Sequence, residues 1–188
     1  MPNYKVYFNA HRELIHKIIE DKTLQVQISE TIDSLVFAYR NGHKVLFCGN
    51  GGSAADAEHL AGELSGRFKL DRAALNAEAL HVNSATLTAI ANDYGYGNAY
   101  ARILSAKAVK GDILFAMTTS GTSENVLKAL GKANEIGVKT ILLSGSGPIN
   151  GDMDIHLSIP STDTPRIQEA MMLLGHIICE EVEKKLFS

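Results

Sequence analysis

Residues 44–64 read KVLFCGNGGSAADAEHLAGEL, and this stretch decides the fold of the chain. Its first five residues form a short apolar run typical of a buried strand, and helical spacing of apolar residues resumes from Ser53 to about Phe68. The glycine-rich turn Gly49–Gly52 joins the two patterns. A strand that leads through glycines into a helix is typical of α/β proteins, which bind ligands at the carboxyl ends of parallel strands.

The same alternation of strand and helix continues to the end of the chain. Helical spacing also precedes it, and Asn41-Gly42 ends the second of two N-terminal helices. We therefore expect an α/β fold in three layers, with about five parallel strands between helices and two helices in front. The further strands are expected at 77–82, 112–117, 139–143 and 155–159, and the helices between and after them at about 85–92, 123–137 and 165–186.

Composition limits the possible ligands. The chain has 188 residues, of which 45% are hydrophobic and 21% charged, as expected for one globular domain. Its net charge is −3 and it contains no run of Lys and Arg, so we expect neither a nucleic acid nor a membrane surface as partner. No apolar segment reaches the ~18 residues of a membrane span, and no signal peptide is expected. Two cysteines without a CxxC motif favour buried thiols in a reducing compartment.

The expected last helix is apolar on more than one side. Between Ile167 and Cys179 its only charged residue is Glu169. A helix that is apolar nearly all round is buried on several sides, which in a chain of this size indicates a subunit interface. Its main apolar stripe comprises Ile167, Ala170, Met171, Leu174, Ile177, Ile178 and Val182, whereas Met172, Leu173, Gly175 and Cys179 lie off it.

Two turns at strand ends are candidate ligand loops. The first, Gly49–Ala54, fits the dinucleotide pattern G-x-G-x-x-A, but the acidic residue expected at the end of the second strand is missing, since Glu78 lies inside that strand. The second, Thr118–Asn125, carries five hydroxyl groups around one glycine. Hydroxyls and amides at a helix N-terminus can hold a phosphate without Lys or Arg. The alternatives are a plain tight turn for the first loop and ordinary helix capping by Thr122 or Ser123 for the second.

Two pairs of polar side chains fall on expected helices. His59 and Glu63 are four residues apart and share a face, so they could chelate a metal or act as acid and base, although such a pair is often only a solvated surface pair. Gln168 and His176 lie on the apolar last helix, where buried polar groups need polar partners. The two side chains either turn inward toward a shared site or meet ligands at a subunit interface. Asn92-Asp93 precede a Tyr-Gly-Tyr-Gly stretch, which indicates a helix end or contacts to sugar hydroxyls.

Taken together, four segments resemble the sedoheptulose 7-phosphate isomerases. They are CGNGGSAADAEHLAGEL at 48–64, AIANDYGY at 89–96, TTSGTSENVLKAL at 118–130 and STDTPRIQEAMMLLGHIICEEVEKKLF at 161–187. The resemblance covers the whole chain in order and implies a single SIS (sugar isomerase) domain over 1–188, with an N-terminal helical pair at 1–41 and an α/β core at 42–188. It further implies a cytoplasmic homotetramer that carries one zinc ion per subunit.

The resemblance also implies roles for individual residues. Glu63 is expected as general base and His176 as general acid. Zinc is expected on His59, Glu63, Gln168 and His176. Met171 stands where many relatives carry His, and Thr118 replaces the usual Ser but keeps a hydroxyl. The substrate-binding residues implied by the resemblance are Asn50, Gly51, Gly52, Ser53, Glu63, Asn92, Asp93, Thr118, Thr119, Ser120, Ser123 and Gln168.

The activity that the resemblance implies is conversion of sedoheptulose 7-phosphate to D-glycero-D-manno-heptose 7-phosphate through an enediol, the first step of ADP- or GDP-heptose synthesis. The same scaffold also serves non-enzymatic adaptors that bind a replication initiator or a phosphosugar signal. An isomerase for sugars of other length and a dehydrogenase are further alternatives. The presence of both Glu63 and His176 favours the enzyme, and the missing ribose-binding acid disfavours the dehydrogenase.

Overall fold

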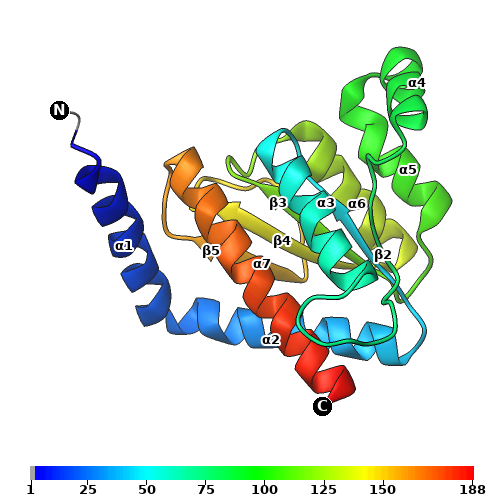
Figure 1. Ribbon diagram of the computed structural model, residues 1–188. Helices are drawn as coiled ribbons and strands as arrows, with labels where there is room; N and C mark the ends of the chain where they lie inside the picture. The colour runs from blue at the N-terminus through cyan, green and yellow to red at the C-terminus, as the bar shows by residue number, and fades with distance from the viewer. Residues whose placement is uncertain (1–2) are drawn as a thin grey trace.

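The computed structural model describes residues 3–188 and has an α/β fold in three layers (Figure 1). In chain order the elements are α1 (Lys5–Glu20), α2 (Lys22–Arg40), β1 (Val45–Cys48), α3 (Gly52–Ser65), β2 (Ala77–Ala79), α4 (Ser84–Tyr94), the 3₁₀ helix η1 (Tyr96–Asn98), α5 (Ala99–Lys107), β3 (Ile113–Thr118), α6 (Glu124–Ile136), β4 (Lys139–Gly145), β5 (Ile155–Ile159) and α7 (Thr164–Phe187).

The sheet has five strands in the order β2-β1-β3-β4-β5, and every neighbouring pair is parallel. This confirms the expected five-stranded parallel sheet between helices. The chain moves outward from β1 to β2 and then returns to place β3 on the other side of β1. The strand order therefore reverses between β1 and β3, and ligands bind at such a switch point outside the carboxyl ends of the strands. Both candidate ligand loops begin there.

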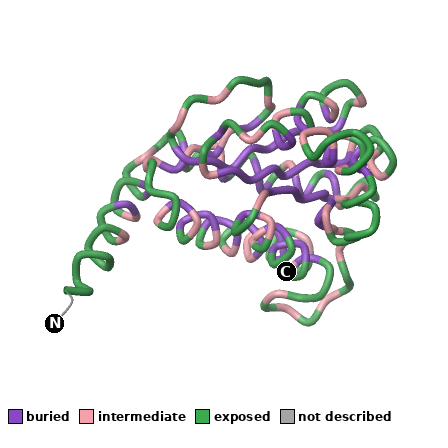
Figure 2. The backbone as a smooth tube through the Cα atoms, turned by 90° about the horizontal axis from the view of Figure 1, so that it is seen from above, coloured by how far each residue is buried: buried purple, intermediate pink, exposed green. Residues whose placement is uncertain are grey.

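The two faces of the sheet bury separate apolar cores. Val45 and Phe47 of β1 face the layer of α2, α3 and α7, whereas Leu46 and Cys48 face the layer of α4, α5 and α6. Successive side chains of a strand point to opposite faces, so a strand covered on both sides must be apolar throughout. All four residues of β1 and all six of β3 are buried accordingly, and the sheet forms the buried centre of the molecule (Figure 2).

Helix α1 extends away from the rest of the molecule (Figure 1). Tyr7 and Phe8 on this helix are 61% and 76% exposed. On α7, Leu173 and Ile177 are also exposed, whereas Gly175 and Cys179 are buried. Within residues 3–188, no helix is long and apolar enough to cross a lipid bilayer.

Two boundaries and one helix differ from the predictions. Helix α3 ends at Ser65 rather than about Phe68, because Gly66 follows and the chain turns into a loop toward β2. Strand β2 ends at Ala79 rather than at residue 82, since the backbone turns after Leu80. Helix α5 was not predicted, although Tyr100, Ile103 and Leu104 are buried on one face of it.

Candidate active site

Side chains that can bind a metal ion gather where α3 and α7 lie side by side. Ligand atoms of His59, Glu63 and His176 all lie within 4.8 Å of one another. The Nε2 atom of His59 is 3.0 Å from Oε1 of Glu63 and 3.0 Å from Nε2 of His176. The structure thus brings together the pair on α3 with a histidine more than a hundred residues further along the chain.

Small residues allow the two helices to approach closely. Gly175 precedes His176, and a β-carbon at this position would collide with the side chain of Leu60 on α3. At the start of α3, a β-carbon on Gly52 would collide with the carboxamide of Gln168. Gln168 therefore reaches from α7 to the first turn of α3, and the two glycines fix the distance between the helices that carry the predicted ligands.

The donor set fits a zinc ion. Two imidazoles and one carboxylate are ligands that zinc takes in catalytic sites, and tetrahedral ligands at their usual zinc distances lie about 3.4 Å from one another. The 3.0 Å separations of His59 from Glu63 and from His176 are close to that value. The unpaired Oδ2 of Asp56 lies one turn before His59 on α3, and burial raises the pKa of Asp56 while His59 acts to lower it.

The second loop forms a cluster of hydroxyl groups at the N-terminus of α6. The hydroxyl of Thr118 is 3.0 Å from that of Ser123 and 3.4 Å from that of Ser120, and Ser120 accepts from the N–H of Thr122 at 3.2 Å. Ser123 occupies the N-cap position but makes no side-chain capping bond, so capping does not explain its hydroxyl. Thr119 follows β3 directly and is half-buried in the same loop.

A reciprocal amide pair joins the two loops across the switch point. Asn50 and Asn125 each donate from Nδ2 to the other's Oδ1, at 2.8 Å in both directions. The hydroxyl of Tyr96 donates to Oδ1 of Asn50 at 2.9 Å. Asn125 is only 3% exposed, and sequence reasoning missed it because its partner lies 75 residues away. Its place beside the hydroxyls in the second loop was the only available signal.

The remaining residues predicted to bind substrate lie either at the start of α3 or at the end of α4. Gly51 has a φ of 55° and precedes α3, where a residue with a β-carbon would be strained, and Ser53 is 3% exposed in the first turn. Asn92 and Asp93 lie exposed at the end of α4, where Asn92 donates to Asp93 at 2.9 Å. Among the hydrogen bonds of the described chain, none joins this pair to the histidine cluster.

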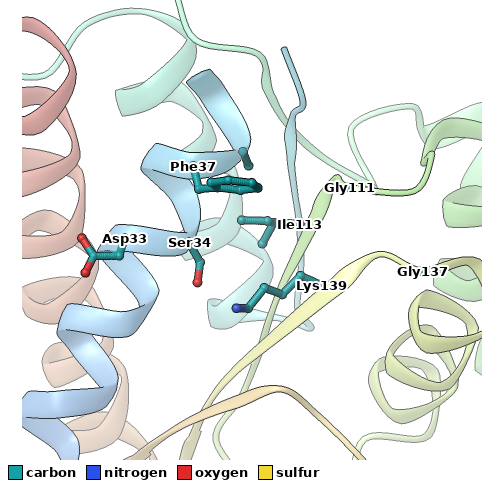
Figure 3. Close-up of a pocket in the computed structure, with 8 residues that line it drawn as sticks. Asp33, Ser34, Phe37, Gly111, Ile113, Gly137 and Lys139 are labelled. Atoms are coloured by element: carbon teal, nitrogen blue, oxygen red, sulfur yellow. The ribbon is translucent and has the colours of Figure 1, made fainter. Parts of the chain in front are cut away.

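An open hollow of about 390 Å³ lies at the opposite end of the sheet (Figure 3). Gly111 and Lys139 line it from the starts of β3 and β4, and Phe37 lines it from α2. Because parallel sheets bind ligands at the carboxyl ends of their strands, we do not assign the substrate to this hollow.

Comparison with known proteins identifies the family. Residues 6–145 match the SIS domain family. The phosphoheptose isomerase of Helicobacter pylori strain Shi470 is 47% identical over 182 residues, which are 96% of this chain and 94% of the relative. The chain belongs to the phosphoheptose isomerase family. The member from Clostridium acetobutylicum is 48% identical over 93% of this chain and 90% of its own length. The solved structure of the member from Francisella tularensis superposes with a TM-score of 0.89 at 34% identity, covering 96% of both chains.

Proposed function

We propose that the chain is an aldose–ketose isomerase that converts sedoheptulose 7-phosphate to D-glycero-D-manno-heptose 7-phosphate, the opening reaction of ADP- or GDP-heptose synthesis. Family membership supports the reaction class, since relatives at 47–48% identity are phosphoheptose isomerases. The observation that carries the proposal is the proximity of the Glu63 carboxylate to the imidazoles of His59 and His176. An isomerisation through an enediol needs such a carboxylate together with a proton donor.

The two loops at the switch point supply the binding site for the open-chain substrate. Thr118, Thr119, Ser120 and Ser123 bind the phosphate together with the N-terminus of α6, because hydroxyls and the helix dipole both favour an anion there. The sugar chain extends from this end toward the histidine cluster, in contact with the first-loop residues and Gln168. The residues proposed for the sugar chain are Asn50, Gly51, Gly52, Ser53, Glu63, Asn92, Asp93 and Gln168.

Zinc is the proposed metal, with one ion per subunit. His59, Glu63 and His176 have the right donor types and spacing, and Gln168 is the proposed fourth ligand from α7. When bound, zinc would polarise the substrate carbonyl or fix the geometry of the site.

Glu63 and His176 carry the proton transfers. Glu63 takes the C1 proton of the ketose, which leaves an enediol, and return of a proton to C2 gives the aldose. His176 donates a proton to the oxygen at C2, on which negative charge develops, and takes up the proton of the C1 hydroxyl when the aldose carbonyl forms. A carboxylate that is also a metal ligand is a weaker base, so the two roles of Glu63 oppose one another.

A non-enzymatic adaptor for a replication initiator or a phosphosugar signal is the second candidate function. An adaptor needs the phosphate loops but has no need of a base and an acid at the other end of the ligand. Glu63 and His176 are both present and lie within 4.8 Å of His59, which favours the enzyme.

The proposed assembly is a homotetramer in the cytoplasm. Exposed apolar residues on α1 and α7, among them Phe8, Leu173 and Ile177, support burial against other copies of the chain. Cys48 and Cys179 are free and buried, and burial raises the pKa of each thiol to about 12, as suits a reducing compartment.

The deciding experiment is conversion of sedoheptulose 7-phosphate by the purified full-length protein, measured with added zinc and after chelation. Formation of an aldoheptose 7-phosphate establishes the reaction, and loss of turnover on chelation with recovery on added zinc supports the metal. Assays with pentulose and hexulose phosphates in parallel test the length of the sugar. Absence of conversion under every condition would reject the enzyme in favour of the adaptor.

A further inference from the structure

A buried carboxylate on α7 holds the loop that follows α3. Glu183 is 0% exposed and accepts from the backbone N–H groups of Phe68, Lys69 and Leu70 at 2.9, 2.8 and 3.1 Å. Arg72 donates from Nε to the same carboxylate at 2.8 Å, and both side chains of this ion pair are 1% exposed. A buried charge with four donors is well compensated, and removal of one member would leave the other unpaired.

Arg72 also binds the last turn of α3. Its guanidinium donates to the carbonyl oxygens of Glu63 and Leu64, at 2.9 and 2.8 Å. These carbonyls have no partner within the helix because they lie in its final turn. The Arg72–Glu183 pair thus joins the end of α3 to α7 immediately beyond the histidine cluster, and it fixes the start of the intervening loop.

The fixed loop places an aromatic ring on the proposed acid. Phe68 stacks on the imidazole of His176 with 5.4 Å between ring centroids and 14° between the planes. His176 also lies next to His59, with Nε2 atoms 3.0 Å apart. His176 lies seven residues before Glu183, about two helical turns along the same side of α7. The carboxylate that holds the backbone of Phe68 and the imidazole that its ring covers therefore share one helix face.

We propose that Phe68 is a positioning residue for His176 and that the buried Arg72–Glu183 pair holds Phe68 in place. This inference rests on the role of His176 in the proposed isomerisation. The flat ring restricts rotation of the imidazole about its last side-chain bond, which is otherwise a soft torsion. Small errors in the placement of a catalytic group reduce turnover strongly. Phe68 makes none of the hydrogen bonds within the hydroxyl loop, so substrate binding is expected to change little.

The test compares Phe68→Leu and Phe68→Met with Phe68→Tyr. Leucine and methionine keep apolar volume but lack a planar face, whereas tyrosine keeps the ring. We expect kcat to fall about tenfold in the first two variants, in line with the sensitivity of catalysis to misplacement, with KM within twofold of the parent and kcat restored in Phe68→Tyr. The dissociation constant for Zn²⁺ alone, measured by chelator competition, is expected to rise in Leu and Met variants and not in the Tyr variant. Asp71→Ala is the matched control, since Asp71 is exposed in the same loop and its side chain makes no hydrogen bond or ion pair with the described residues.

The outcomes separate this proposal from the proposed function. If the parent protein neither converts substrate nor binds Zn²⁺, the proposed function fails together with the inference. If the parent does both, and Phe68→Leu and Phe68→Met keep kcat and Zn²⁺ affinity within twofold, the positioning role is wrong. It is equally wrong if Phe68→Tyr is as impaired as Phe68→Leu, or if Asp71→Ala shares the loss. Circular dichroism of every variant establishes that the fold is retained, and two ring-less variants guard against local misfolding in either one.

Discussion

Replacement of Asn125 by alanine tests whether the amide pair aligns the two ligand loops. The substitution removes both hydrogen bonds with Asn50, each of which is 2.8 Å long. A hydrogen bond contributes about 1 kcal/mol net, so the pair accounts for about 2 kcal/mol. The site is 3% exposed, and the cavity left by the deleted atoms adds to the loss. We therefore expect the free energy of unfolding to fall by about 2–3 kcal/mol.

The same change is expected to lower kcat/KM about tenfold, because the side chain of Asn50 keeps, among the described residues, only the bond from Tyr96. Its loop then no longer has a fixed position against the phosphate loop. Asn134→Ala is the matched control. Asn134 lies on the same helix, is exposed and also makes two hydrogen bonds, to Asp152 and Thr140, but it is remote from both loops. We expect it to cost about 1 kcal/mol or less and to leave kcat/KM unchanged.

The assays are urea unfolding followed by circular dichroism at one fixed protein concentration and steady-state kinetics with sedoheptulose 7-phosphate. The reasoning is refuted if Asn125→Ala loses stability but keeps kcat/KM within twofold of the parent. That result would make the amide pair a structural contact without influence on substrate binding or turnover.

The other predictions concern the base, the phosphate site and pH. Glu63→Gln should reduce kcat by roughly 10³-fold without a change in circular dichroism. Glu58→Gln is the control, since Glu58 is exposed on the same helix, and this variant should retain activity. Full activity of Glu63→Gln would exclude Glu63 as the base. Ser123→Ala should raise KM about tenfold, because a bond to a charged phosphate is lost, and a KM no higher than that of Thr122→Ala would contradict the phosphate site. Burial lowers the pKa of His156 below the 6.5 that is usual for a histidine side chain. The unfolded chain therefore binds more protons below that pH, so stability should fall as pH drops from 6.5, and His156→Gln should weaken this dependence. An equal pH dependence in both proteins, measured by urea unfolding, would remove His156 as its cause.

The sheet could be predicted from sequence because its strands are covered on both faces. In a small α/β domain, an apolar run such as Ile113–Met117 is typical of a strand that is buried on both faces. The glycine turn after β1 marks the switch point directly. The ends of α3 and β2 were predicted less accurately. Helix α5 was missed since two glycines at 95 and 97 suggested a turn, although Tyr100, Ile103 and Leu104 carry helical spacing.

The site was predictable only where both partners lie on one element. His59 and Glu63 are neighbours on a helix, so their spacing alone placed them together. The contacts of Asn125, Phe68 and Glu183 join segments between 75 and 115 residues apart, which no local pattern encodes. Gln168 and His176 stood out as polar residues on an apolar helix, but only the resemblance, and not their spacing, placed them with His59 and Glu63 on α3.

The Asn50–Asn125 and Arg72–Glu183 contacts each hold a pair of segments in place, at opposite ends of the site. The Asn50–Asn125 pair fixes the loops after β1 and β3, where the phosphate is proposed to bind. The Arg72–Glu183 pair fixes the ends of α3 and α7, beyond the residues proposed for proton transfer. Helix α3 connects the two, since it begins just after Asn50 and its last carbonyls bind Arg72. A substrate held by its phosphate at one end of α3 thus meets Glu63 at a distance set by a rigid helix. Damage to the first contact should therefore appear mainly in KM, and damage to the second mainly in kcat.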